Sequence, residues 1–469
     1  MARFICDDRS QSFLLPPDLR DWLPQNDMAH FVLAACERVG IDAFKVGAGI
    51  EGRPQYHPRM MLALLVYCYA NGILSSRKIE RASYRDIGVR FVAANLQPDH
   101  DTIARFRRDN LVAFEAAFVQ VLMLAKETGL LAVGTVSIDG TKMDASASKI
   151  KTVRYDRAKA LRIKLAADIA ALTAKAEAAD ASNEIDPQAL PSEIVRREVL
   201  KAKLDAAVAR LEEDAKSAYE AALPAYQSKK AAYDEKAKAR AQRGTAPVPP
   251  EDELPPPDAQ INLTDPDSKL MRKSKSHEYR QSYNAQAVVD ADGSQLILHT
   301  DVITTPSDQK SFARVILEMG ADKGGVGKSG VGLPVTVLAD AGYACGKQVK
   351  ILKDNNIDPL VAIGRMMPHR PYDFRPPPGD PGGVEQKPPQ AINEPWRTLM
   401  KARLETDNAK ALYKKRKQTV KPVFGIIKSV LGMRTFSLRG MEKVETEWKL
   451  MALAYNCKRL AKLEATAKQ

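Results

Sequence analysis

Two carboxylates with small neighbours stand where strands are predicted to end. The run VGTVSIDG carries β-branched residues up to Asp139, and the run LPVTVLADAG leads in the same way to Asp340. Side chains at the ends of strands point into the crevice where mixed and parallel sheets usually bind ligands. If the two strands are neighbours, both acids can hold one divalent cation, because Mg²⁺ prefers carboxylate oxygens and leaves positions open for phosphate and water. Two such ions about 3.5–4 Å apart support phosphodiester chemistry.

The alternative for each aspartate is that it only caps the turn that follows it, which is the commoner role of a single Asp at the end of a strand. Other ligand types do not compete for a metal. The six histidines show no ligand spacing, and the five cysteines form no C-x-x-C pair. The sequence therefore predicts neither a zinc site nor a disulfide framework, and it fits a reducing cytosol.

The stretch ADKGGVGKSG, residues 321–330, resembles a phosphate-binding loop, but its surroundings argue against that role. Such a loop leaves a strand and opens a helix, so that backbone amides and the helix N-terminus face the anion. Here the run follows a helix predicted to end near Met319 and leads into a strand, and Asp322 stands in place of the first glycine. We interpret the segment as a flexible loop rather than the site of an ATPase.

The charge of the chain favours a polyanionic partner. With 71 Lys and Arg against 58 Asp and Glu, the formal net charge is +13 and the pI is about 9.3, which suits nucleic acid. Between Lys401 and Arg434 we count ten Lys or Arg against Glu405 and Asp407. The acidic start of the chain lacks the apolar core of a signal peptide, and the charge-free run 60–76 is shorter than the ~20 residues of a membrane span, so no membrane partner is expected.

The first 131 residues are predicted to form a helical domain, because apolar residues recur three and four apart between short polar turns. Asp99 or Asp101 can cap a helix that carries Arg105, Arg107 and Arg108. These three arginines can lie along a DNA backbone, and the alternative is an ordinary solvated helix face.

The rest of the chain predicts an α/β (α+β) arrangement, a mixed sheet interrupted by a long helical insertion. Residues 132–154 and 262–365 alternate β, ββ, α, β, α, β. Between them, residues 155–261 contain a glycine-free run of helical spacing, predicted to be a hairpin, and then a Pro-rich acidic connector. Residues 366–393 form a Pro/Gly-rich loop, and residues 394–469 are helical and complete the catalytic part of the chain.

Taken together, several motifs resemble insertion-sequence transposases of the DDE class over nearly the whole chain. They are the helical run QYHPRMMLALLVYCYANGILSSRKIE with PDHDTIARFRR, the strands VSIDGTKMDAS and VLADAGY, the hairpin YNAQAVVD, and the terminal block YKKRKQTVKPVFGIIKSVLGMRTFSLRG followed by EWKLMALAYNCKRL. The resemblance implies a ribonuclease-H-like catalytic domain, with Asp139 and Asp340 as the first two acids of the triad and as ligands of two Mg²⁺ or Mn²⁺ ions. It also implies transposon terminal inverted repeats and target DNA as partners, a homodimer on DNA, and action in the bacterial cytoplasm at the nucleoid.

The third acid departs from the family pattern. Members of this group usually carry Glu in a V-E-P-V-F-G run, and here the run reads VKPVFG, with Lys421 at the position of the expected Glu. A cation cannot ligate a metal, so Lys421 could instead pair with the two aspartates. Glu405 and Asp407 lie about four helical turns upstream, too far to substitute. The sequence therefore predicts weak or absent strand transfer, and it leaves a non-catalytic DNA-binding derivative as the alternative function.

The basic segment around Lys421 resembles the tyrosine-arginine-glutamate-lysine signature of related transposases. On this resemblance Lys428 and the pair Arg416 and Lys417 hold phosphates of the transposon end, and Tyr413 stacks on or hydrogen-bonds a flanking nucleotide. Positions 421 and 428 are seven apart, so a regular helix would place them on one face. Arg434 completes the basic set that we expect to contact DNA.

Overall fold

The chain forms two compact units. The computed structural model describes residues 18–46, 55–182, 189–238, 246–250, 254–273, 276–320, 332–363 and 394–467. The first unit comprises residues 1–143, 284–438 and 442–469, and the second comprises residues 144–283 and 439–441. Two segments that the sequence analysis singled out lie outside the described residues. They are the Pro/Gly-rich loop 366–393 and the glycine-rich run 321–331.

The N-terminal part of the first unit is helical, as its periodicity predicts. Ten consecutive residues of α2, Met61 to Ala70, are buried, so this apolar run is the core of a helical cluster. Asp99 caps α5 by accepting hydrogen bonds from the amides of Asp101 and Thr102, as its position predicts. No helix in the described part of the chain is long and apolar enough to cross a membrane. The helices are α1 (Met28–Glu37), α2 (Pro58–Ala70), α3 (Ser76–Arg85), α4 (Ile87–Val92), α5 (His100–Asp109) and α6 (Leu111–Glu127).

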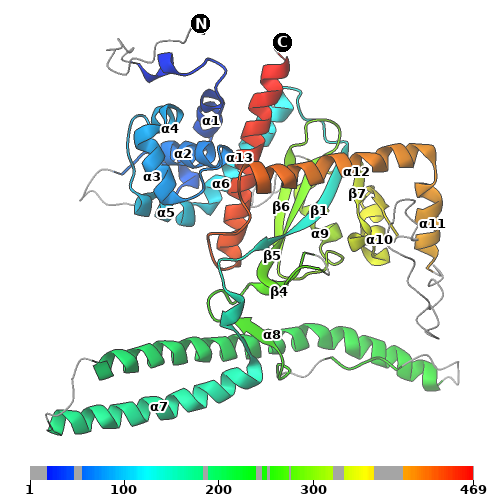
Figure 1. Ribbon diagram of the computed structural model, residues 1–469. Coiled ribbons are helices and arrows are strands. Elements are labelled where there is room, and N and C mark those ends of the chain that lie inside the picture. Colours follow the sequence, from blue (N-terminus) through cyan, green and yellow to red (C-terminus); the bar gives the residue numbers. More distant parts are fainter. Residues whose placement is uncertain are drawn as a thin grey trace, which may run out of the picture. The chain divides into compact units, whose positions relative to one another are not determined.

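A mixed sheet occupies the centre of Figure 1. Its order is β4-β5-β1-β7-β8, with β6 beside β5. The pairs β1–β7 and β7–β8 are parallel, whereas β4–β5 and β5–β6 are antiparallel. This sheet and its helices confirm the predicted ribonuclease-H-like α+β fold. The elements are β1 (Thr135–Asp144), β4 (Lys269–Met271), β5 (Arg280–Asp290), β6 (Ile297–Ile303), α9 (Phe312–Gly320), β7 (Thr336–Ala339), α10 (Gly346–Asp354) and β8 (Asp358–Val361).

The C-terminal helices complete the first unit. Helix α13 (Met441–Ala467) contacts the sheet through Trp448, whose indole donates to the carbonyl of Gln286, and through Asn456, whose amide pairs with the backbone of Ile297. The same helix contacts α2, because Lys458 donates to the carbonyl of Ala70. It therefore joins the N-terminal helices to the sheet. The preceding helices are α11 (Pro395–Leu404) and α12 (Asp407–Gly425), and α12 continues into a π-turn, η5 (Ile426–Val430).

Helix α12 tolerates a proline in its interior because the freed carbonyl finds another donor. Pro422 has no N–H, so the carbonyl of Gln418, four residues earlier, loses its usual helical partner. The side-chain amide of Gln295, at the start of the β6 region, donates to that carbonyl at 2.9 Å. This bond fixes α12 against the sheet at the level of residues 418–422.

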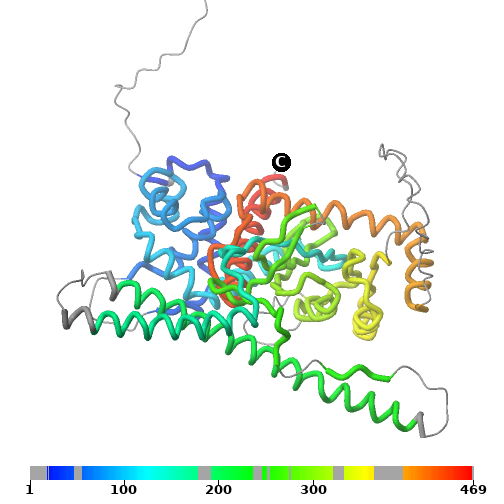
Figure 2. The backbone as a smooth tube through the Cα atoms, turned by 60° about the horizontal axis from the view of Figure 1, so that its bottom comes forward, coloured from blue at the N-terminus to red at the C-terminus, as the bar shows by residue number. Residues whose placement is uncertain are grey.

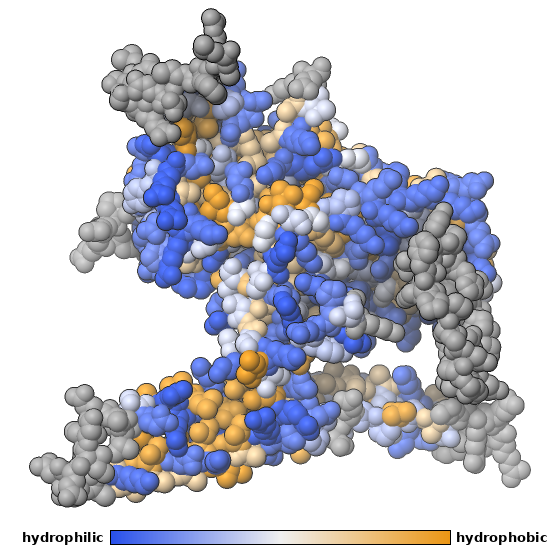
Figure 3. Space-filling model, in the orientation of Figure 1, coloured by the Kyte–Doolittle hydropathy of each residue, from blue (hydrophilic) through white to orange (hydrophobic). Residues whose placement is uncertain are grey.

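The second unit contains the predicted helical hairpin, formed by α7 (Tyr155–Ser182) and α8 (Ala189–Lys238), which lie side by side in Figures 1 and 2. A small sheet of β2 (Thr152–Arg154) and β3 (Gln260–Asn262) supports its base. The hairpin has its own core, and Figure 3 shows that apolar residues also reach its surface, among them Ile163 and Val195, with 69% and 56% of their surface exposed. The buried core residues are Tyr155, Ala158, Leu204, Ala207, Val208, Leu211 and Ile261.

A group of charged side chains lies between α13, α6, β6 and α9 in the first unit. Lys449 of α13 pairs with Glu115 of α6, and Arg314 of α9 pairs with Asp301 of β6. Burial raises the pKa of the nearby Glu445 to about 7, the charges of Asp301 and Glu115 add to that rise, and Lys449 and Arg314 oppose it. Glu445 is therefore more readily protonated in the fold than in the unfolded chain.

This shift predicts a pH-dependent stability. A carboxyl group whose pKa is raised on folding stabilises the fold below its unfolded pKa of about 4.5, and that contribution is lost as the pH rises through about 7. We expect Glu445→Gln to be about 2 kcal/mol more stable than the wild type at pH 8 and equally stable near pH 4.5, as judged by urea unfolding. Glu442→Gln, an exposed change on the same helix, is the control and should show no such pH dependence. A constant difference at all pH values would contradict the assignment.

Candidate active site

The two aspartates singled out from the sequence lie at the same level of neighbouring strands. The parallel register of β1 and β7 pairs Thr135 with Thr336 and Ser137 with Leu338. Asp139 comes two residues after Ser137, inside β1, which continues to Asp144, and Asp340 comes two residues after Leu338, directly after the end of β7. The expectation that the first strand ends at Asp139 is therefore wrong, but the register places both aspartates at the same level of adjacent strands. The parallel register of β1 and β7 is therefore what brings these two carboxylates close together, as the sequence led us to expect.

The electrostatics of the pair agree with their closeness. Burial first, and then the charge of Asp340, raise the pKa of Asp139, while Arg416 and a hydrogen bond from the amide of Gly140 lower it; the net result is a pKa of about 6. Asp340 caps the short turn that follows β7, since its carboxylate accepts from the amide of Gly342 at 2.8 Å. Asp340 therefore has the capping role that the sequence left open as an alternative, and it also lies at the level of Asp139 on the neighbouring strand.

Helix α12 crosses the sheet (Figure 1), and its Arg416 lies beside Asp139. The guanidinium Nη1 lies 3.7 Å from the Asp139 carboxylate, and the two side chains are only 10% and 15% exposed. Both Nη1 and Nε of Arg416 are buried, and neither has a hydrogen-bond partner within the described part of the chain. Leaving buried donors unpaired is costly, so this guanidinium is poised to receive an anionic acceptor such as a phosphate oxygen.

Two further residues of the predicted signature contact the same two strands. The Tyr413 hydroxyl donates to the carbonyl of Ala339 at 3.0 Å, and its ring lies 5.8 Å from the Arg416 guanidinium. The Lys428 ammonium donates to the Thr141 hydroxyl and to the carbonyl of Lys142, immediately after Asp139 on β1. Tyr413 is thus held by a backbone contact that leaves only its ring for stacking, and Lys428 supports the end of β1.

The Lys421 side chain does not take the place that sequence reasoning gave it. It is exposed, and among the described residues the cation that pairs with Asp139 is Arg416. The expectation that positions 421 and 428 share one face of a regular helix also needs correction, because the π-turn at 426–430 lies between them and Lys428 is half-buried. A π-turn carries an extra residue per turn and rotates the following side chains, and such turns are frequent at functional sites.

A third carboxylate, Asp308, lies beside the two aspartates, in the loop between β6 and α9. Its Oδ1 accepts from the side-chain amides of Asn284 and Gln286 at 2.6 and 2.8 Å, and the Lys142 ammonium lies 3.9 Å away. Tyr343 donates to the other end of the Gln286 amide. Sequence reasoning missed these residues, although Asn284 and Gln286 alternate along YNAQAVVD, where buried polar side chains on one face of a strand are a signal of a site.

The glycines that follow the two aspartates are required by close approach. A Cβ on Gly140 would lie 2.4 Å from Nε2 of Gln286 and 2.9 Å from Oδ1 of Asp308, and a Cβ on Gly342 would lie 2.9 Å from Oδ1 of Asp340. Any larger residue at Gly140 would push into the hydrogen-bonded amides. This explains why the motifs read Asp-Gly and Asp-Ala-Gly.

The pair Asp139 and Asp340 has the chemistry of a divalent-ion site. Two half-buried carboxylates repel each other when both are charged, and a cation bound between them reduces that repulsion. In the described part of the chain, no three His, Cys, Asp or Glu side chains already converge as a ligand set. The two aspartates therefore fit an ion as a pair, with the remaining positions open.

The arginines of α5 divide into exposed and buried. Arg105 and Arg108 are exposed, as a DNA-contacting role requires. Arg107 is only 7% exposed and donates to the Tyr69 hydroxyl and to the carbonyl of Leu74, so the expectation that it lies on a DNA backbone is corrected. Its helical face explains the difference, because Arg107 is four residues after the fully buried Ile103.

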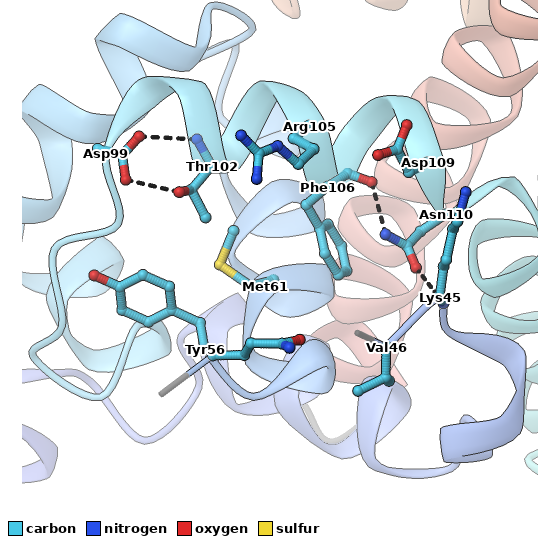
Figure 4. A pocket seen from close by; sticks show the side chains of 11 residues that line it. Lys45, Val46, Tyr56, Met61, Asp99, Thr102, Arg105, Phe106, Asp109 and Asn110 are labelled. Atoms are coloured by element: carbon cyan, nitrogen blue, oxygen red, sulfur yellow. Dashed lines mark hydrogen bonds between the residues drawn. The ribbon is translucent and has the colours of Figure 1, made fainter. Parts of the chain in front are cut away.

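Beside α5 the N-terminal helices enclose a pocket of about 680 Å³ (Figure 4). Arg105 lies on the α5 side of it, and Asp99 makes its capping bonds to Thr102 at the start of the same helix. The lining mixes both signs of charge. It comprises Lys45, Val46, Gln55, Tyr56, Met61, Asp99, Thr102, Arg105, Phe106, Asp109 and Asn110.

Comparison with known protein families matches both ends of the chain. Residues 17–109 match a transposase domain (DUF772), and residues 387–461 match a transposase DDE domain. The first covers α1 to α5, and the second covers α11, α12, η5 and most of α13. No curated protein and no solved structure matches the chain. These two matches, one at each end of the chain, support an insertion-sequence transposase of the DDE type.

Proposed function

We propose that this protein binds the terminal inverted repeats of its insertion sequence and acts there by metal-dependent hydrolysis and strand transfer of phosphodiester bonds. The observation that carries the proposal is the register that sets Asp139 and Asp340 side by side, with Arg416 next to them. DDE transposases usually use a divalent metal ion, and two Mg²⁺ or Mn²⁺ ions held by Asp139 and Asp340 would supply the activation of an attacking oxygen. The chain acts as a homodimer on DNA, in the bacterial cytoplasm at the nucleoid.

The protein's own groups have separable roles in this proposal. Arg416 offers its two unpaired buried donors to a phosphate of the cleaved strand, and the ring of Tyr413 offers a stacking surface. Lys428 holds the backbone at residues 141–142 and so keeps β1 in place after Asp139. Exposed cations at Arg105, Arg108, Lys417 and Arg434 contact the phosphates of the bound ends.

The second candidate function is a non-catalytic DNA-binding derivative that occupies transposon ends. The position of Lys421 favours it, because a cation stands where the family usually has the third acid, and Arg416 already neutralises Asp139. An ATPase is not favoured. Among the described residues, α9 precedes the glycine-rich run and β7 follows it, the reverse of the strand-to-helix order that a phosphate loop needs.

DNA binding tests the class of protein directly. The inverted repeats flanking the gene provide the probe, and a shuffled duplex of the same composition provides the control. We expect the repeat to be bound at least about 100-fold more tightly than the shuffled duplex, with an affinity that falls steeply with salt. Arg105→Ala and Arg108→Ala should weaken both affinities by a similar factor. Equal affinity for the two duplexes would remove the proposal.

A further inference from the structure

Asp308 lies within reach of both ends of the aspartate pair. The position that a Cβ of Gly342 would occupy is 2.9 Å from Oδ1 of Asp340 and 3.3 Å from Oδ2 of Asp308. On the other side, Oδ1 of Asp308 is 2.9 Å from the position of a Gly140 Cβ, next to Asp139. The carboxylate thus spans the space between the backbones that carry the two predicted metal ligands.

The orientation of Asp308 is fixed by its surroundings. Oδ1 accepts two amide hydrogen bonds, from Asn284 and Gln286, and Gln286 is itself held by the Tyr343 hydroxyl. No hydrogen bond to Oδ2 is found within the described residues, and this oxygen is the one on the Asp340 side. A side chain that is only 17% exposed, with one oxygen anchored and the other left open, is arranged as a ligand rather than as a surface charge.

A second buried oxygen faces the same space. Asn284 is fully buried, and its Oδ1 has no hydrogen-bond partner among the residues that the structure describes. This oxygen lies 2.8 Å from the position that a Cβ on Gly140 would occupy. An unsatisfied buried acceptor costs about 1–3 kcal/mol, which a cation within reach of this oxygen would offset. Asparagine carbonyl oxygens and carboxylates are ligands that hard divalent cations accept.

We propose that Asp308 is a third carboxylate for the divalent ions at Asp139 and Asp340, with the carbonyl oxygen of Asn284 facing the same ions. This rests on the proposed function and gives the site an acid that the sequence lacks at position 421. In the described residues three acids do not converge as a ligand set. The proposal therefore requires Oδ2 of Asp308 to move toward Asp340 when the ions bind. The glycine at 140 is needed because it leaves space for this group of oxygens.

Binding of Mn²⁺ to the DNA-free full-length protein tests the inference without any assay of activity. The free ion is measured by electron paramagnetic resonance during a titration. We expect Asp308→Asn to weaken Mn²⁺ binding at least about tenfold, the size typical of a lost ligand or its support. Gly140→Ala, which would displace the anchored Oδ1, should act in the same direction. Asp354→Asn is the control for the loss of one negative charge, because Asp354 is an exposed residue of α10 paired with Lys350, and it should bind as the wild type does.

The outcomes separate this inference from the proposed function. Unchanged Mn²⁺ affinity in Asp308→Asn, together with a loss in Asp139→Asn, would overturn the role of Asp308 and leave the metal-dependent transposase in place. Unchanged affinity in Asp139→Asn as well would overturn the metal site itself. The melting temperature of each variant is compared with that of the wild type, so that a loss of fold is not taken for a loss of ligand.

Discussion

Replacing Lys421 with glutamate is expected to raise metal-dependent cutting of the inverted-repeat ends about 100-fold over the wild type. The reason is electrostatic. The change replaces an exposed cation of α12 with an acid at the position where the resemblance places the third acid, and this carboxylate would have to turn toward Asp139 and Asp340 when the ions bind. A single group that stabilises charge at a reacting centre is typically worth about 10²–10³ in rate. Lys421 is exposed, so the substitution disturbs no packing. Cutting is followed on a labelled end fragment with Mg²⁺ and with Mn²⁺.

Two variants make this measurement specific. Lys414→Glu places the same charge change on an exposed position of the same helix, outside the set of proposed DNA contacts, and it should not raise cutting. Asp139→Asn added to Lys421→Glu should return cutting to the background while binding to the ends persists. If the wild type and Lys421→Glu cut equally well, the assignment of position 421 to the third acid is wrong. If neither cuts but both bind the repeats, the non-catalytic derivative is the function.

The Arg416–Asp139 contact bears on how the wild type behaves. The Arg416 guanidinium lies 3.7 Å from the Asp139 carboxylate, so a divalent ion bound by Asp139 would compete with the arginine for the same carboxylate. A phosphate bound to Arg416 would draw the guanidinium from Asp139 and free it for the ion. Metal affinity and end binding are therefore expected to support each other, which is a coupling between two ligands of one site.

The acids were predictable from the sequence because their signals are local. A run of β-branched residues that stops at Asp139, and another that stops at Asp340, is visible without any knowledge of the fold. No local signal predicts that the two acids are adjacent, because some two hundred residues separate them along the chain and only the pairing of β1 with β7 brings them together. The resemblance to a family supplied that proximity, and the parallel register of β1 and β7 accounts for it.

The residues that sequence reasoning missed lack such a local signal. Asp308 lies in the irregular segment TTPSDQKS. This segment has no helical or strand periodicity that would indicate a special role for its aspartate. Its importance comes from Asn284 and Gln286, which β5 brings to it from more than twenty residues away. The π-turn after Gly425 was likewise invisible, because the sequence continues with residues that suit a regular helix.

Replacing Arg107 with methionine is expected to destabilise the first unit by about 3 kcal/mol. Arg107 reaches from α5 into the protein, donates to Tyr69 and to the carbonyl of Leu74, and its charge faces the buried Glu447 of α13. The Glu447 carboxylate accepts the amides of Ser437 and Leu438 and is 2% exposed. Removing the arginine leaves a buried carboxylate without its compensating charge and two acceptors without a donor, which is costly.

The measurement is urea unfolding followed by tryptophan fluorescence. The three tryptophans, Trp22, Trp396 and Trp448, all belong to the first unit, so the signal reports its unfolding alone. Arg108→Met, an exposed neighbour on the same helix, should change the stability by less than about 0.5 kcal/mol but should weaken DNA binding. If Arg107→Met is as stable as the wild type but binds DNA poorly, the structural role of Arg107 is wrong and Arg107 contacts DNA instead. Because Arg107 and Glu447 lie on α5 and α13, their interaction connects the N-terminal helices to the helix that contacts the sheet.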